Sequence, residues 1–295
     1  MDNTPYLLDK RLIRESFNRA APGYDDAALL QQTVAQRLLE RLDLIKLQPQ
    51  RILDVGAGTG QLTLKLTRRY KNAEVIALDL APAMLTLARQ RLGVLDKWFG
   101  KQRFICADAD HLPLADNSVD MIISNFAIQW CSDLDQTFGE FQRVLKPGGL
   151  LLFATFGPDT LKELRQAWRA VDDKIHVNSF IDMHDIGDAM IRCQFSDPVM
   201  DAERLTLTYT DGMSVMRDLK AMGAHNVSAG RNHALTGKQK LQQMLTAYEQ
   251  FRHGDGLLPA TYEVVYGHAW GTEQLKSKSQ EQGVVRISLT NLRRK

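Results

Sequence analysis

Short apolar runs alternate with helical patterns along the first half of the chain. Runs that predict β-strands lie at 51–55, 74–79, 103–107, 121–124 and 150–156. Between them, apolar residues recur at the three- and four-residue spacing of helices, for example at 62–69 and after Pro82. Strands that alternate with helices are typical of a parallel sheet. We therefore expect an α/β, Rossmann-like fold.

The second half of the chain adds two strands with an unusual separation. Alternating apolar residues predict strands at 199–209 and 260–268, which complete a seven-stranded, mostly parallel sheet. About 50 residues separate these strands, with helical patterns near 213–222 and 238–252. A connection of this length is usually functional. We therefore expect a helical lid, inserted at about 211–259 over the carboxyl edge of the sheet, to select the substrate.

Further helical segments flank the strands. Residues 5–46 predict an N-terminal helical cap, broken at Ala21-Pro-Gly-Tyr24. Another helix is expected to open with Pro158 in its first turn, where a missing N–H group costs little, and a third spans 182–195. Together these segments predict one domain, residues 1–270. A basic tail follows at 271–295, and the sequence does not decide whether it is ordered.

The loop after the first strand has glycine at every second position. Gly56, Gly58 and Gly60 follow a strand that carries Asp54, and glycine permits the positive φ angles and close backbone approach that ligand loops need. A dinucleotide-binding G-x-G-x-x-G loop is excluded because Gln61 stands at its last position. A phosphate-binding P-loop is excluded because no Lys-Ser/Thr pair follows. The spacing therefore favours a cofactor without a phosphate contact.

Composition narrows the class of protein. The chain has 295 residues, 44% hydrophobic and 24% charged, as is usual for a globular enzyme. No apolar run approaches the roughly 20 residues of a membrane span, and no signal-peptide core follows Met1, so we expect a cytoplasmic protein. The net charge of +2 argues against general nucleic-acid binding. Cys106, Cys131 and Cys193 are widely separated, so neither a metal site nor a disulfide scaffold is expected.

The acidic strand and the G-x-G-x-G loop resemble the first motif of the class I S-adenosylmethionine (SAM) methyltransferases. A helix N-terminus and loop N–H groups suit the carboxylate of SAM, and Asp54 suits its cationic end. Asp79 ends the second strand, where an acid in such folds binds ribose hydroxyls. Asp108 resembles the family residue that meets the adenine amino group. Asn125 and Phe126 resemble the motif beside the methyl donor.

Two residues of the cap complete the expected cofactor site. Tyr24 matches a family position that covers the cofactor, and Gln31 is expected to help hold its methionine end. Gln129 and Trp130 either wall the cofactor or begin the next helix, and packing is the favoured role of Trp130. The cofactor-binding residues that the resemblance predicts are Tyr24, Gln31, Asp54, Gly56, Gly58, Gly60, Asp79, Leu80, Met84, Asp108, Ala109, Asn125 and Phe126.

Motifs elsewhere in the chain narrow the resemblance. They are S-F-N-R-A-A at 16–21, F-G-P-D-T-L at 156–161, the segment 180–187, the segment 219–226 and P-A-T-Y-E at 259–263. Over about residues 10–270 they resemble the malonyl-acyl-carrier-protein O-methyltransferases of biotin synthesis. This resemblance implies methylation of the free carboxyl of a malonyl thioester, carried by acyl carrier protein or coenzyme A, early in biotin (pimeloyl) synthesis. The oligomeric state is not indicated.

A carboxylate acceptor needs little chemical help. With a pKa near 4 it is already an anionic nucleophile at neutral pH, so we expect no catalytic acid or base. Alignment of the reactants supplies the rate advantage. An acidic carrier would be steered by basic side chains of the lid, namely Arg231, Lys238, Lys240 and Arg252. The expected substrate-binding residues are Tyr209, Lys220, His225, Asn226 and Arg231.

The sequence leaves two other functions open. A small-molecule methyltransferase of quinone or lipid synthesis would share every cofactor motif, and its substrate often needs a general base. A SAM-binding assembly factor would keep the fold without methylating anything. Intact Asp54, Asp79, Asp108 and Asn125 argue against a decayed site, but they name only the methyl donor.

Overall fold

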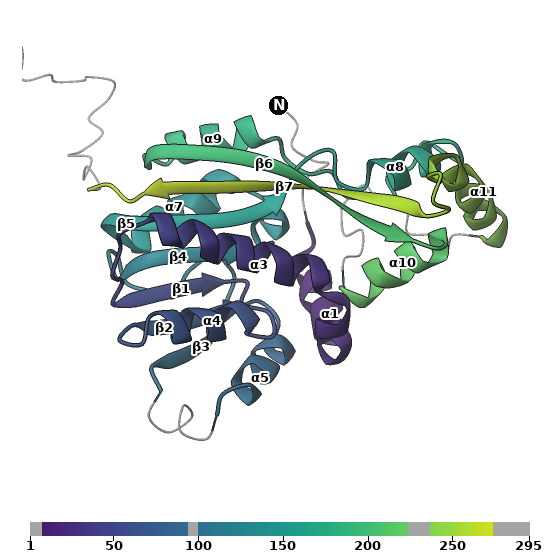
Figure 1. Cartoon of the computed structure of the whole chain (residues 1–295). Coiled ribbons are helices and arrows are strands. Elements are labelled where there is room, and N and C mark those ends of the chain that lie inside the picture. Colours follow the sequence, from purple (N-terminus) through teal and green to yellow (C-terminus); the bar gives the residue numbers. More distant parts are fainter. Residues whose placement is uncertain (1–7, 94–99, 224–236, 274–295) are drawn as a thin grey trace, which may run out of the picture.

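The computed structural model describes residues 8–93, 100–223 and 237–273, which form a seven-stranded sheet flanked by helices (Figure 1). The strands are β1 (Arg51–Val55), β2 (Glu74–Asp79), β3 (Gln102–Cys106), β4 (Val119–Asn125), β5 (Leu145–Phe156), β6 (Ser196–Tyr209) and β7 (Leu258–Trp270). Their order is β3-β2-β1-β4-β5-β7-β6, in which β7 is antiparallel to both neighbours and the other pairs are parallel. The expected mostly parallel, Rossmann-like sheet is confirmed.

Helices pack on both faces because the central strands are apolar on both sides. In β1, Ile52 and Leu53 are fully buried in opposite cores. The Ile52 side is covered by α3 (Leu29–Arg41), α4 (Gln61–Arg69) and α8 (Lys162–Arg169), and the Leu53 side by α7 (Leu134–Val144) and α9 (Met183–Arg192). Another helix, α5 (Pro82–Gln90), packs on β2 and β3. Within the described ranges, no helix is both long and apolar enough to cross a membrane.

The cap consists of α1 (Lys10–Ala20), α2 (Tyr24–Ala27) and α3, with the 3₁₀ turn Ala21–Gly23 at the predicted break. α1 begins where the Asp9 carboxylate accepts hydrogen bonds from the first N–H groups of the helix. Asp25 ties the cap to the glycine loop, because its carboxylate accepts a hydrogen bond from the Thr59 hydroxyl at 2.6 Å and pairs with Arg91. Residues 5–7 of the predicted cap lie outside the described residues.

Two helices, α10 (Gly212–Ala221) and α11 (Lys238–Tyr248), stand between β6 and β7, and we call them the lid. β7 pairs with β6 from Leu258 but with β5 only from Val264 onward. The two strands therefore continue past the rest of the sheet as a two-stranded arm that carries the lid (Figure 1). The helices expected near 213–222 and 238–252 are confirmed, and residues 224–236 lie outside the described ranges.

The prediction that a helix opens with Pro158 in its first turn is wrong. α8 starts at Lys162, and residues 158–161 form a turn instead. The cause is a long-range contact: the Leu161 N–H group donates to the Thr261 carbonyl of β7 at 2.6 Å, and Leu161 takes a φ of 54°. A residue in this left-handed region interrupts a right-handed helix. The arm, rather than the local preference of proline, therefore sets the helix boundary.

Candidate functional site

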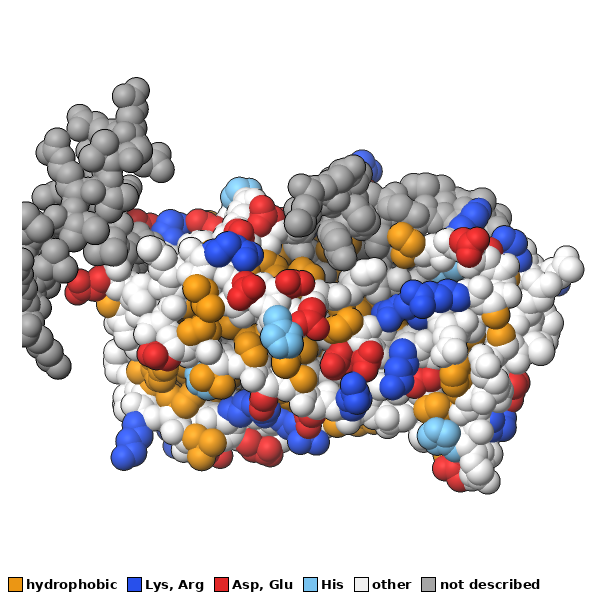
Figure 2. Space-filling view, turned by 90° about the horizontal axis from the view of Figure 1, so that it is seen from above, with side chains coloured by type: hydrophobic (Ala, Val, Ile, Leu, Met, Phe, Trp, Pro, Cys, Tyr) orange, Lys and Arg blue, Asp and Glu red, His pale blue; other side chains and the backbone are white. Residues whose placement is uncertain are grey.

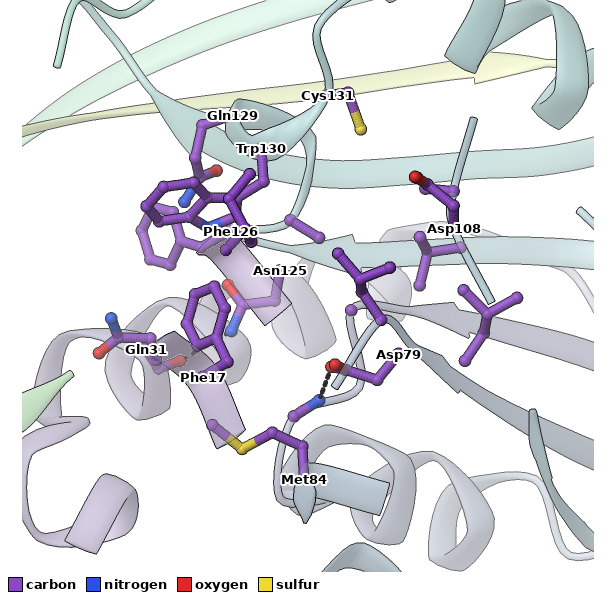
Figure 3. A pocket seen from close by; sticks show the side chains of 18 of the residues that line it. Phe17, Gln31, Asp79, Met84, Asp108, Asn125, Phe126, Gln129, Trp130 and Cys131 are labelled. Atoms are coloured by element: carbon purple, nitrogen blue, oxygen red, sulfur yellow. Dashed lines mark hydrogen bonds between the residues drawn. The ribbon is translucent and has the colours of Figure 1, made fainter. Parts of the chain in front are cut away.

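A cavity opens at the carboxyl ends of β1, β2 and β4, beside the cap (Figure 3). We call it the strand-end cavity. Most of the expected cofactor-binding residues line it, although they come from separate segments of the chain. They are Tyr24, Gln31, Gly56, Gly58, Asp79, Leu80, Met84, Asp108, Ala109, Asn125 and Phe126. Of the expected set, Asp54 and Gly60 lie outside its lining.

Glycine is needed at each of the three loop positions for a different structural reason. Gly56 has a φ of 72°, and a Cβ there would lie 2.2 Å from the Cβ of Ala127, so no larger residue fits without displacement. Gly58 has a φ of 54° and donates its N–H to the Asp79 carboxylate at 2.8 Å. Gly60 has a φ of 81° and packs tightly against α5. Gly60 therefore shapes the loop and the start of α4 rather than lining the cavity.

Two carboxyl groups lie at the loop, Asp54 buried and Asp79 half-buried. Asp79 accepts backbone hydrogen bonds from Gly58 and Ala81, both at 2.8 Å, yet burial raises its pKa to about 6. Burial also raises the pKa of Asp54 to about 7, although the Thr63 hydroxyl donates to it at 2.6 Å. Asp54 lines a neighbouring crevice that shares Gly58 with the strand-end cavity. Both acids therefore ionise at a higher pH than an exposed aspartate does.

Asp108 is paired with a residue that sequence reasoning missed. The ammonium group of Lys10, at the start of α1, lies 2.8 Å from a carboxylate oxygen of Asp108 and 2.8 Å from one of Asp110. Lys10 also lines the strand-end cavity. Because Lys10 and Asp108 are 98 residues apart in the sequence, no local pattern indicates the pair. These ion pairs attach the cap to the segment that follows β3.

Two buried amide oxygens in the cavity have no hydrogen-bond partner within the described part of the chain. The Asn125 amide nitrogen donates to the main-chain carbonyl of Gln31 at 2.9 Å, which leaves Asn125 Oδ1 unpartnered. Gln31 Oε1 is also buried and unpartnered. A buried acceptor without a donor costs free energy. Both oxygens therefore suit a ligand that carries N–H donors, such as an ammonium group.

Aromatic rings that the motifs left unassigned form part of the cavity wall (Figure 3). Trp130 ends the 3₁₀ turn Ile128–Trp130 and meets the ring of Phe17 edge-on, with centroids 5.4 Å apart. Gln129 lies in the same turn and also lines the cavity. Neither Gln129 nor Trp130 begins the next helix, which starts at Leu134, and both line the strand-end cavity.

A second cavity, the lid cavity, is lined from α8, α10 and the arm strand β7, and has a volume of about 410 Å³. Gln31, Trp130, Phe156 and Met222 line both cavities, so the two cavities meet at these residues, which we call the junction. The junction is mainly apolar, and the Phe156 ring stacks on Phe126 with centroids 4.2 Å apart. Two molecules bound in the two cavities would face each other across the junction.

The lid cavity has two cations and a histidine among its polar groups. Arg217 and Lys220 come from α10, and both are exposed. His176 stacks on Trp168 with centroids 3.8 Å apart, and its Nε2 lies 2.7 Å from the Asp172 carboxylate. The histidine is therefore held in place from two directions.

Few of the expected substrate-binding residues are placed in this cavity. Lys220 lines it, whereas Tyr209 does not, and burial raises the pKa of the Tyr209 phenol to about 12. Of the residues expected to steer a carrier, Lys240 and Arg252 are engaged in ion pairs with carboxylates. Three further expected residues lie outside the described ranges: His225, Asn226 and Arg231.

Known proteins match this chain in sequence. Residues 53–153 match a family model described as a methyltransferase domain. The chain is 56% identical over 267 residues to a malonyl-acyl-carrier-protein O-methyltransferase of Methylovorus sp., with 90% of each chain covered. It is 44% identical to malonyl-acyl-carrier-protein O-methyltransferase 1 of Coxiella burnetii, with 100% of each chain covered.

Solved structures share the fold at low identity. The YcgJ protein of Bacillus subtilis has a TM-score of 0.56 and 18% identity, covering 80% of this chain and 98% of its own. A phosphoethanolamine N-methyltransferase of Haemonchus contortus has a TM-score of 0.53 and 16% identity, covering 87% and 57%. These likenesses bear on the fold alone, whereas the curated relatives match nearly the whole chain at high identity. The chain belongs to the malonyl-acyl-carrier-protein O-methyltransferase family.

Proposed function

We propose that the protein transfers a methyl group from SAM to the free carboxyl of a malonyl thioester on acyl carrier protein. The observation that carries this proposal is the 56% identity to a malonyl-acyl-carrier-protein O-methyltransferase over 90% of each chain. The two cavities that meet at the junction support it, because a donor site and an acceptor site must adjoin for group transfer. The product is a malonyl methyl ester, an early intermediate of biotin synthesis.

The strand-end cavity offers a suitable group for each part of SAM. Asp79 suits the ribose hydroxyls, and Asp108 suits the adenine amino group. The unpartnered oxygens of Asn125 and Gln31 suit the ammonium group of the methionine moiety. The N–H groups of the glycine loop, at the start of α4, suit its carboxylate. When bound, SAM supplies a methyl group that its sulfonium makes electrophilic.

The protein's part in the reaction is alignment and exclusion of water. The acceptor carboxylate is ionised at neutral pH, so no side chain has to remove a proton. Three of the four junction residues are mainly apolar, namely Trp130, Phe156 and Met222. In such surroundings opposite charges attract each other more strongly than in water, which favours a reaction that neutralises them. We therefore assign His176 to binding and not to base catalysis.

We propose acyl carrier protein rather than coenzyme A as the carrier, because the relatives are named for the malonyl-carrier-protein substrate. On the face shown in Figure 2, basic side chains lie at the lid end and also at the opposite end, interspersed with acidic ones. Attraction of an acidic carrier to this end would be short-ranged at physiological salt, where charges are screened within about 8 Å.

A labelling experiment tests the function directly. Purified protein is incubated with methyl-labelled SAM and, in separate reactions, with malonyl carrier protein, malonyl coenzyme A or acetyl carrier protein. We expect label on malonyl species only, with the carrier protein the faster substrate. Label on the acetyl species, or on none of the three, would contradict the proposal. A faster reaction with malonyl coenzyme A would contradict only the choice of carrier.

A further inference from the structure

Tyr262 lines the lid cavity and carries a buried hydroxyl group. The residue lies on β7 and is 2% exposed. Its hydroxyl lies beside the Tyr209 hydroxyl, and neither makes a hydrogen bond of normal geometry within the described ranges. Burial raises its pKa well above that of an ordinary tyrosine, and the neighbouring Tyr209 and Asp218 add to this shift. The phenol therefore stays protonated at neutral pH and can donate a hydrogen bond to a ligand.

The backbone on both sides of Tyr262 is held firmly. The Thr261 hydroxyl and N–H both donate to the Glu163 carboxylate on α8. Glu263 accepts hydrogen bonds from the N–H groups of Gly157 and Asp159, at 2.9 and 2.8 Å. Because strand and turn fix the neighbours, the Tyr262 ring is positioned before any ligand arrives, which lowers the entropic cost of binding.

Tyr262 also lies close to the junction. Its ring centroid is 5.9 Å from that of Phe156, a junction residue that lines both cavities. The lid-cavity cations Arg217 and Lys220 differ from it, because their side chains are exposed and water screens their charge. Tyr262 is therefore a buried, neutral donor near the place where the acceptor must meet the methyl donor.

Resting on the function proposed above, we propose that the Tyr262 hydroxyl binds one oxygen of the acceptor's free carboxylate and orients the other toward the junction. A single neutral hydrogen bond suits this task, because it fixes direction without neutralising the nucleophile as a buried cation would. The exposed cations attract the acceptor, and the phenol selects a carboxylate over an uncharged acyl end.

The test compares Tyr262→Phe with Tyr266→Phe. Tyr266 is a matched control because it is also 2% exposed on β7, but its hydroxyl donates to Glu203 and it does not line the lid cavity. With SAM saturating, we expect Tyr262→Phe to lower kcat/KM for malonyl carrier protein by about 10- to 100-fold, as for a lost bond to a charged group. The SAM dissociation constant should change less than twofold. Tyr266→Phe should leave kcat/KM within about twofold.

Thermal unfolding separates a binding role from a structural one. Removing a hydroxyl without a partner should leave the Tm of Tyr262→Phe unchanged or raise it, whereas a structural hydroxyl would lower it. Binding of malonyl coenzyme A, measured by calorimetry with S-adenosylhomocysteine present, should weaken by a similar factor, and binding of acetyl coenzyme A should not. Unchanged kcat/KM in an active Tyr262→Phe would overturn this inference alone, whereas a wild-type protein that methylates no malonyl species would overturn the function.

Discussion

The side-chain amide nitrogen of Gln31 lies 3.4 Å from the sulfur of Met222, so the cap and the segment after α10 meet where the two cavities join. Gln31 Oε1 is buried and has no hydrogen-bond partner among the described residues. We expect Gln31→Leu to raise the SAM dissociation constant about tenfold or more, because a bond to a charged group is lost. Titration calorimetry measures this. Gln36→Leu, an exposed change on the same helix, is the control, and equal effects of both variants would disprove the assignment.

The Lys10 ion pairs predict a second effect on the cofactor site. Lys10→Met removes the charge that binds Asp108 and Asp110 while keeping the length of the side chain. We expect SAM to bind several-fold more weakly, because partly exposed pairs contribute about 1 kcal/mol or less. The difference from wild type should shrink in 1 M salt. Arg11→Met removes a neighbouring surface pair and should leave SAM binding unchanged. A salt-independent difference would rule out an electrostatic cause.

The raised pKa values of Asp54 and Asp79 predict how stability changes with pH. Their folded-state pKa values, about 7 and about 6, exceed the unfolded value of 3.8, so folding favours the protonated acids. The contribution of these two acids to the free energy of unfolding is fully present below pH 3.8 and is lost as the pH rises through 6 to 7. Calorimetry at pH 5.5 and 8 should therefore show a smaller loss of Tm in Asp54→Asn than in wild type. An equal loss in both proteins would contradict the burial argument.

The glycine loop predicts unequal costs for two alanine substitutions. Gly56→Ala combines a positive φ with a Cβ 2.2 Å from Ala127, so we expect a clear loss of Tm and of SAM binding. At Gly58 a Cβ meets no atom within 4 Å, so only the backbone strain of about 1 to 2 kcal/mol applies. Thermal unfolding of both variants measures the difference. A larger loss of Tm in Gly58→Ala would contradict the loop geometry.

A variant of His176 separates the proposed reaction from one that needs a base. If the acceptor is already ionised, His176→Asn should reduce kcat less than about tenfold at pH 7.5. Removing a general base would reduce kcat by about 10²- to 10⁴-fold. The matched control is His184→Asn, since His184 also pairs with an aspartate but is exposed on α9. A loss of several hundredfold in His176→Asn alone, with SAM binding intact, would favour a small-molecule methyltransferase.

The sheet and the cofactor loop could be predicted from the sequence because their causes are local. Apolar runs mark the strands, and the glycines at 56, 58 and 60 are required by positive φ angles at those positions. The lid helices were placed for the same reason, from the spacing of their apolar residues. These features need no knowledge of which segments meet in space.

Features that depend on distant contacts were missed or misplaced. Lys10 meets Asp108 only after the cap has folded over the strand ends. The start of α8 is set by Leu161 and its hydrogen bond to Thr261, which outweighs the preference of Pro158 for a first helical turn. Tyr262 is one of three aromatic residues in β7, and only the cavity distinguishes it from a core residue.

The length of β7 fixes how far Tyr262 lies from the sheet. One continuous strand carries Val264, which pairs with β5 at the sheet, and Tyr262, which faces the lid cavity. Each residue advances the strand by about 3.3 Å and alternates its side. Deleting one residue between Tyr262 and the sheet would therefore turn the Tyr262 ring to the other face of the arm, away from the acceptor, while the cofactor loop stays in place. Within such a fold, substrate range can evolve through the lid, but the distance between the reactants is set by the strand beneath it.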